Sequence, residues 1–108
     1  MNIFGKIHAV IPRDHFELPD HRTIYPVDIV ISVPECRLSQ MGSIYLKGKL
    51  VLCTLMSESP NPSTPSEGSF VCADINSYAS YSQEKATYFN RTTLNKWADL
   101  SSMNWQWQ

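Results

Sequence analysis

Alternation of apolar and polar positions is the clearest pattern in the first half of the chain. In residues 27–33 every odd position is apolar, while Asp28 and Ser32 have the other parity. A period of two is typical of a β-strand with one buried face. β-Branched residues, which favour strands, are frequent both here and in residues 3–11. The pattern therefore predicts two strands in these segments.

Residues 43–56 form the longest run of this kind. One parity is almost wholly apolar and is expected to be buried; it holds Ile44, Leu46, Leu50, Leu52 and Met56. Lys47 and Lys49 have the opposite parity. Gly48 interrupts the apolar parity and marks either a bulge in one long strand or the bend between two. Residues 70–81 and 86–89 complete the predicted strands.

Prolines and one short helical pattern set the rest of the expected fold. Pro12, Pro19, Pro26 and Pro34 leave gaps that suit one strand each and no helix of ordinary length. Near the end, Thr92 or Thr93 can cap a helix, and Leu94, Trp97, Ala98 and Ser101 recur at helical spacing. Trp105 and Trp107 alternate again and fit a last strand. The expected fold is mainly β, a β-sandwich or barrel-like antiparallel sheet in one domain over residues 1–108, with one short C-terminal helix.

Residues 57–68 differ in composition from the predicted strands. They hold three prolines, many hydroxyl residues and no large apolar side chain. Such a segment buries too little surface to offset the entropy of ordering it, which predicts a mobile surface loop. Long loops inside compact domains are often functional.

The cysteines suggest a reducing environment. Cys36, Cys53 and Cys72 are odd in number and lie among apolar residues, so they are expected to be buried free thiols. No signal-peptide pattern begins the sequence, and no apolar run approaches the length of a membrane span. These features predict a cytoplasmic protein with no membrane segment.

Residues 13–22, RDHFELPDHR, are the densest group of candidate chemical side chains. Metal binding would need His15, His21, Glu17 and His8 to converge, and the spacing of the histidines matches no common zinc motif. An acid–base pair would need His15 and His21 to face one substrate. A solvated connection whose charges keep it off the core is the favoured interpretation. The chain also has no nucleophile elbow and no phosphate-binding glycine loop, so we expect no enzyme activity, no metal and no cofactor.

Charge is unevenly distributed although the net charge is only −1. Residues 57–84 contain four acidic residues and no lysine or arginine, so this segment carries −4. Tyr78 and Tyr81 lie in the same segment, within INSYASYSQ, a composition typical of protein-binding surfaces. An acidic surface with tyrosines suits a basic partner.

The sequence alone therefore favours a protein that acts by binding another protein. The expected function is an immunity or antitoxin-type inhibitor that occludes a basic toxin, such as a nuclease domain. The expected contact residues are Glu58, Glu67, Asp74, Tyr78, Tyr81 and Glu84, with Asp14, Glu17 and Asp20 as a second acidic edge. A phage-type inhibitor of a host defence protein would share these traits.

Two other functions remain open at this point. A single-stranded nucleic-acid-binding β-barrel could use Tyr45, Lys47 and Lys49, although the low net charge makes nucleic acid the less favoured partner. A small hydrolase could use His15 and His21. The sequence gives no indication of the oligomeric state.

Overall fold

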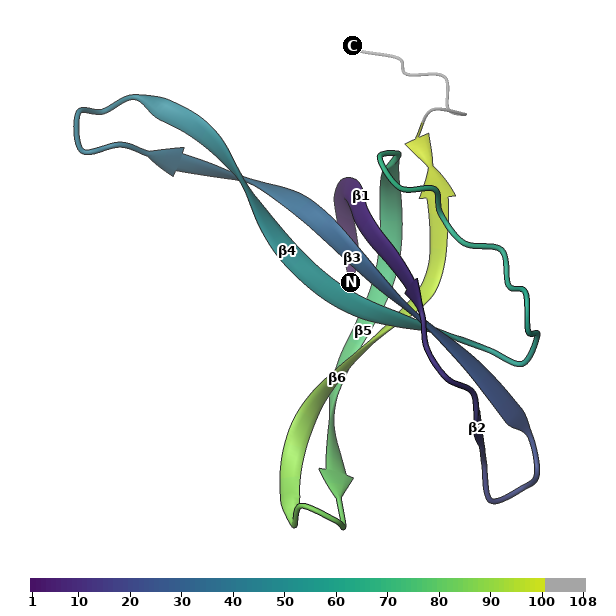
Figure 1. Cartoon of the computed structure of the whole chain (residues 1–108). Helices are drawn as coiled ribbons and strands as arrows, with labels where there is room; N and C mark the ends of the chain where they lie inside the picture. The colour runs from purple at the N-terminus through teal and green to yellow at the C-terminus, as the bar shows by residue number, and fades with distance from the viewer. Residues whose placement is uncertain (101–108) are drawn as a thin grey trace.

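The computed structural model describes residues 1–100, which form six strands and, within that range, no α-helix (Figure 1). The strands are β1 (Asn2–Pro12), β2 (Phe16–Glu17), β3 (Thr23–Leu38), β4 (Ile44–Ser57), β5 (Phe70–Ser82) and β6 (Thr87–Asp99). Their order is β1-β5-β6-β4-β3, and pairing between β1 and β3 closes a five-stranded barrel, with β2 added at the edge of β3. All pairs are antiparallel except β4–β6, which is parallel at Thr54 and Thr93. The predicted mainly β, barrel-like fold is confirmed.

Strand β1 closes the barrel because it bends between two partners. Residues 2–6 pair with β5 and residues 6–12 pair with β3, with a register shift between Ile7 and Ala9. A bulge of this kind bends a strand and increases its twist. Gly5 lies at the crossing, where an added Cβ would stand 2.6 Å from the carbonyl oxygen of Ser32. Only glycine lets the two backbones approach this closely.

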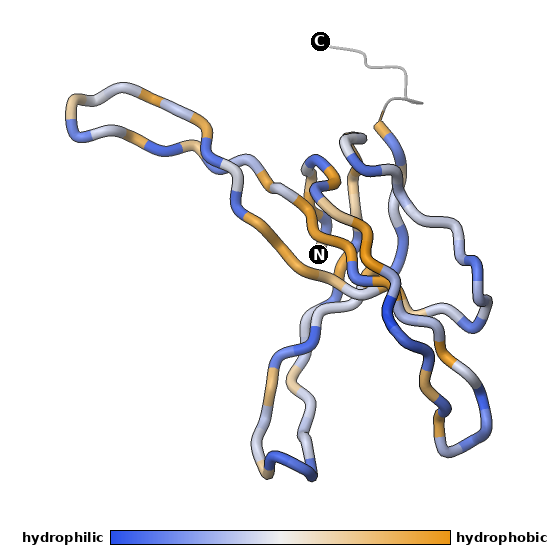
Figure 2. The backbone as a smooth tube through the Cα atoms, in the orientation of Figure 1, coloured by the Kyte–Doolittle hydropathy of each residue, from blue (hydrophilic) through white to orange (hydrophobic). Residues whose placement is uncertain are grey.

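The barrel interior is filled by aliphatic side chains from all five strands. The core residues are Ile7, Val27, Ile29, Ile31, Cys53, Val71, Ala73, Ile75 and Leu94. The three from β3 have the odd parity that the alternation predicts, so that expectation is confirmed. Figure 2 shows apolar residues concentrated where β1, β3 and β4 cross.

The predicted buried face of β4 is wrong. Cys53 is fully buried and Val51 and Leu55 pack against the core, whereas Leu50 and Leu52 are more than half exposed. Both parities are apolar in the part of β4 that crosses the barrel, so alternation alone does not say which faces inward. The lysines that suggested the opposite assignment lie beyond the barrel. Gly48 marks neither a bulge nor a bend, since β3 and β4 stay in register from one end to the other.

Two prolines lie inside β3 instead of bounding it. Pro26 and Pro34 pair with Met56 and Gly48 of β4. On the other edge of β3, β1 pairs only with residues 27–32. The missing N–H of each proline therefore falls where β1 offers no ladder partner, as edge positions allow.

The predicted C-terminal helix is also wrong over its described part, because residues 92–99 belong to β6. Leu94 pairs with Ile75 and Lys96 with Asp74, so a register shift leaves Asn95 as an extra residue. This shift brings Leu94 and Trp97 to the same inner face, three residues apart, which imitates helical spacing. Ser101, Trp105 and Trp107 lie outside the described residues.

Three segments project from the barrel (Figure 1). They are the far part of the β3–β4 hairpin, the far part of the β5–β6 hairpin, and the arm, residues 13–22, which includes β2. The radius of gyration is 16.9 Å, against about 13 Å for a compact domain of this length.

Within residues 1–100 no helix is long and apolar enough to cross a membrane.

Candidate functional site

A groove lies between the arm and the β5–β6 hairpin. Its cavity volume is about 240 Å³, and it is lined by Phe16, Leu18, Ile24, Met56, Tyr78 and Arg91. The arm supplies the first two residues, the adjoining ends of β3 and β4 supply Ile24 and Met56, and the hairpin supplies the last two. Segments distant in sequence therefore meet at one site.

The register of the β5–β6 hairpin gives one of its faces an aromatic and cationic character. Tyr78 lies opposite Arg91, and Ser80 lies opposite Phe89, so these four residues share a face. The Arg91 guanidinium carbon is 5.5 Å from the centre of the Phe89 ring. Tyr78 and Phe89 are 43% and 37% exposed. Two rings beside a guanidinium are thus available to a ligand.

The same face continues to the hairpin tip. Ser82, Lys85, Thr87 and Phe89 line a second hollow of about 260 Å³. Phe89 therefore connects the hollow at the tip with the groove at the barrel, through its contact with Arg91. The result is an interrupted row of aromatic and cationic side chains along the hairpin.

The opposite face of this hairpin holds a different aromatic pair. Tyr81 lies opposite Tyr88, and their ring centres are 5.0 Å apart. Tyr78 and Tyr81, which the sequence placed on one binding surface, therefore point to opposite sides of the hairpin. Only Tyr78 lines the groove.

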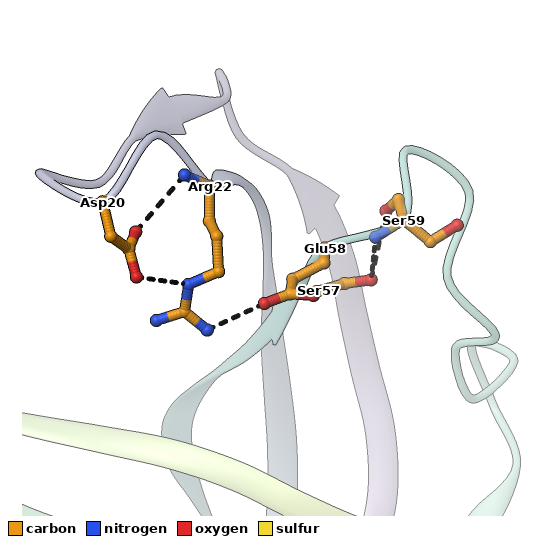
Figure 3. Close-up of polar contacts among 5 residues, drawn as sticks. All are labelled: Asp20, Arg22, Ser57, Glu58 and Ser59. Atoms are coloured by element: carbon orange, nitrogen blue, oxygen red, sulfur yellow. Dashed lines mark hydrogen bonds and ion pairs between the residues drawn. The ribbon is translucent and has the colours of Figure 1, made fainter.

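Arg22 holds the arm against the end of β4 (Figure 3). Its Nε donates to Asp20 at 2.7 Å, and its Nη1 donates to Glu58 at 2.9 Å. The backbone N–H of Arg22, and then its guanidinium, lower the pKa of Asp20, and both carboxylates raise the pKa of Arg22. Ser57 and Ser59 brace the start of the following loop through their mutual hydrogen bonds. One wall of the groove is thus fixed by exposed ion pairs.

The two histidines of the arm lie in separate contacts. The His15 ring packs 5.6 Å from that of Tyr25, and His21 Nδ1 lies 3.0 Å from a Glu17 carboxylate oxygen. His21 has a φ of 69° in the turn that reverses the arm. In the part of the chain that the structure describes, no three histidine, cysteine or acidic side chains are placed to hold a metal ion.

The remaining acidic residues expected to bind a partner are dispersed. Glu67 accepts a hydrogen bond from the backbone N–H of Val10, and Asp74 pairs with the amino group of Met1. The loop that contains Glu67 lies along β1, since Gly68 N–H donates to the Ile7 carbonyl at 2.8 Å. Asp14 is on the arm and Glu84 is at the tip of the β5–β6 hairpin, and both are exposed. Only Asp20 and Glu58 are brought together, through Arg22.

Tyr45, Lys47 and Lys49 do share a face, but on the β3–β4 hairpin. Arg37 and Glu35 lie opposite Tyr45 and Lys47 on that face. Glu35 accepts a hydrogen bond from Arg37 at 2.8 Å and lies 3.8 Å from Lys49 Nζ. The hydrogen bond from Arg37, and then the lysines, lower the pKa of Glu35. None of these five residues lines the groove.

The cysteines differ from the expectation that all three are buried. Cys53 is buried, but Cys36 and Cys72 are exposed. They sit on strand faces that the core does not cover, although their sequence neighbours are apolar. Burial raises the pKa of the Cys53 thiol to about 11.

Comparison with known proteins adds no functional assignment. No protein-family model and no curated protein matches this chain. Sequence reasoning missed Phe16 and Arg91, which line the groove with Tyr78, and Phe89, which lines the neighbouring hollow. The available signal was the alternation of Phe89 and Arg91, which puts both on one face of a strand.

Proposed function

We propose that this protein binds single-stranded nucleic acid in the groove between the arm and the β5–β6 hairpin. The strand order resembles that of OB folds, five-stranded Greek-key barrels that bind oligonucleotides and oligosaccharides. In those barrels the ligand lies on the second and third strands, between the loops that follow the first and fourth strands. Here these loops correspond to the arm and the tip of the β5–β6 hairpin. The position of the groove between them is the observation that carries the proposal.

The side chains of the groove and of the adjoining hollow suit unpaired bases. Phe16, Tyr78 and Phe89 are each 37–43% exposed, so each presents ring surface on which a base can stack. Base–aromatic stacking is tolerant of sequence because every base has a π-face. Arg91, between Tyr78 and Phe89, is placed to pair with a phosphate. This cation favours an anionic oligonucleotide over a neutral oligosaccharide.

The charges around the groove predict binding dominated by stacking. Arg22 is already paired with Asp20 and Glu58, which leaves Arg91 and Lys85 to meet phosphates. With about two phosphate contacts, the slope of log K against log salt should be about −1.4 for a single strand. A slope steeper than about −3 would place the phosphates on another, more basic surface.

Fluorescence anisotropy with a labelled oligothymidylate of about 16 nucleotides, the upper end of known site sizes for such barrels, tests the proposal. Replacing Tyr78 with alanine removes one stacking surface, worth about 1–3 kcal/mol per base, so the Kd should rise about 5- to 150-fold. Tyr81→Ala is the matched control, because Tyr81 is similarly exposed on the same hairpin but faces the other way. Its Kd should be unchanged.

Other variants separate the groove from the β3–β4 hairpin. A Lys47→Ala/Lys49→Ala variant should keep its affinity, since neither lysine lines the groove. A duplex of the same sequence should bind more weakly than the single strand, because its bases are already stacked. No binding to DNA or RNA single strands at low salt, or an equal loss for Tyr78→Ala and Tyr81→Ala, would contradict the proposal.

Inhibition of a basic protein is the second proposal. Asp14, Glu17, Asp20 and Glu84 lie on the two projections that flank the groove, so a cationic segment of a partner would meet carboxylates on both sides. To bind such a segment, Asp20 and Glu58 would first have to break their ion pairs with Arg22. In this proposal, as in the first, the protein acts by binding and not by catalysis.

Charge reversal distinguishes the two proposals. An Asp14→Lys/Glu84→Lys variant should lose affinity for a co-purifying basic partner by at least about tenfold, since rim charges steer association. The same variant should bind oligonucleotide as well as the parent or better. If a basic partner binds the parent and the Asp14→Lys/Glu84→Lys variant equally well, the acidic projections beside the groove are not its binding surface.

A further inference from the structure

The outer face of the projecting β3–β4 hairpin is mainly aliphatic. Leu38, Ile44, Leu46, Leu50 and Leu52 are between 57% and 73% exposed. The unbroken register places all five on one face, with Leu38 opposite Ile44. Figure 2 shows apolar residues recurring along this hairpin as it leaves the barrel. A monomer gains nothing from exposing such a row, which is typical of an interaction site.

Charge is completely separated between the two faces of this hairpin. The four charged residues of the segment 30–52 are Glu35, Arg37, Lys47 and Lys49, and all have the odd parity. The even parity carries the five aliphatic residues, with Val30, Ser32, Pro34, Cys36 and Gly48 between them. The apolar face is therefore uncharged over its whole length.

We infer that this apolar face binds the same face of a second copy of the chain, forming a two-fold symmetric dimer. In such an interface the same patch is buried on both copies, so any charge on it would be buried twice. An uncharged face avoids this cost. Its aliphatic composition, without exposed tyrosine, tryptophan or arginine, also fits a homodimer better than a transient contact between different proteins.

The five side chains supply roughly three quarters of the area that each partner buries in a standard interface. Taking roughly 180 Å² for a fully exposed leucine or isoleucine, the exposed fractions of the five residues amount to roughly 600 Å², against about 800 Å² per partner in a standard interface. Neighbouring Cys36 and Pro34 are also exposed and add to this. The apolar face shares no residue with the groove, so the dimer can be tested independently of nucleic-acid binding.

Sedimentation equilibrium of the full chain over a wide concentration range tests the dimer. The parent should show a mass twice the 12.3 kDa of the chain. Leu46→Lys should weaken dimerisation at least about 100-fold, because each copy would bury an unpaired charge in an apolar interface. Leu46 is 73% exposed in the monomer, so the variant should keep the parent's circular dichroism spectrum.

Tyr88→Lys is the matched control, since Tyr88 is 75% exposed on the other hairpin and should leave the dimer intact. Leu50→Lys is a second variant on the inferred face and should act like Leu46→Lys. A parent that is monomeric at every concentration would overturn the inference. A dimer that survives both lysine variants, or a larger assembly, would also overturn it.

Discussion

Two glycines approach Ser32 from different strands, and their substitution by alanine should have very different costs. An added Cβ at Gly5 would lie 2.6 Å from the Ser32 carbonyl oxygen and 2.6 Å from Ile31 Cγ2. An added Cβ at Gly48 would meet only the Ser32 hydroxyl, with Ser32 Cβ 3.8 Å away. The first obstacle is backbone in the closed barrel, whereas the second is a hydroxyl that can rotate.

The expected magnitudes follow from these contacts. Gly5→Ala should reduce the free energy of unfolding by about 2–3 kcal/mol, the upper end for overpacking a closed core. For a chain of this size that is a fall in Tm of roughly 10–20 °C. Gly48→Ala should change stability by less than about 1 kcal/mol, because the gain from replacing a strand glycine offsets the rotation of Ser32.

A Ser32→Ala background separates the two effects. It removes the hydroxyl that meets Gly48 but leaves the carbonyl that meets Gly5. In this background Gly48→Ala should become stabilising by about 0.5–1 kcal/mol, while Gly5→Ala should stay as costly as before. The measurement is chemical and thermal unfolding followed by circular dichroism at one fixed protein concentration, since association shifts the apparent stability.

One result would refute this reasoning directly. If Gly5→Ala unfolded at the parent's midpoint, β1 and β3 would not cross as closely as the barrel requires. Restored stability of Gly5→Ala in the Ser32→Ala background would also refute it, because the clash would then be with the Ser32 hydroxyl and not with its carbonyl.

Further predictions concern the core, the thiols and the arm. In the Leu46→Lys background, expected to be monomeric, Ile29→Ala should cost about 2–5 kcal/mol of unfolding free energy and Leu52→Ala less than about 1 kcal/mol, both measured by urea denaturation. A large cost for Leu52→Ala would mean that the even-numbered face of β4, not the odd-numbered one, is buried. At pH 8, Ellman's reagent should modify Cys36 and Cys72 in folded Leu46→Lys, which is expected to be monomeric, and Cys53 only on unfolding. Because folding raises the Cys53 pKa from 9.0 to about 11, the stability it contributes is full below pH 9 and is lost as the pH rises toward 11, as an alkaline denaturation series compared with Cys53→Ala should show. In an NMR titration of Arg22→Gln, the lowered pKa of Asp20 should rise toward its ordinary value of 3.8. An unchanged pKa would show that the ion pair with Arg22 does not lower it.

Strand positions could be predicted from the sequence because alternation reports local geometry. Residues 27–33 have one apolar and one mixed parity, and their buried face was predicted correctly. In residues 50–56 both parities are apolar, so the inward face depends on how β4 pairs and twists, which is not a local property. The same limit explains Leu94 and Trp97, whose spacing comes from a register shift against β5.

Site residues were harder to predict than strands because the groove is assembled by topology. Tyr78 was singled out for its composition, and it does line the groove. Phe16 and Arg91 gave no signal by themselves, since they are 75 residues apart in the sequence and meet only when the barrel closes. Charge counting also gave no sign that Asp20, Glu58 and Asp74 pair within the chain.

The bend of β1 makes the order of events in folding predictable. Its second half can pair with β3 as soon as the first third of the chain exists, but its first half must wait for residues 70–74, almost seventy positions later. Joining such distant segments has a large entropic cost and is typically slow. During synthesis, β1, β3 and β4 would therefore form a three-stranded meander in which residues 2–6 have no partner until residues 70–74 are made, about 1–3 s after β4. During that interval the unpaired strand edge is exposed to mispairing and aggregation.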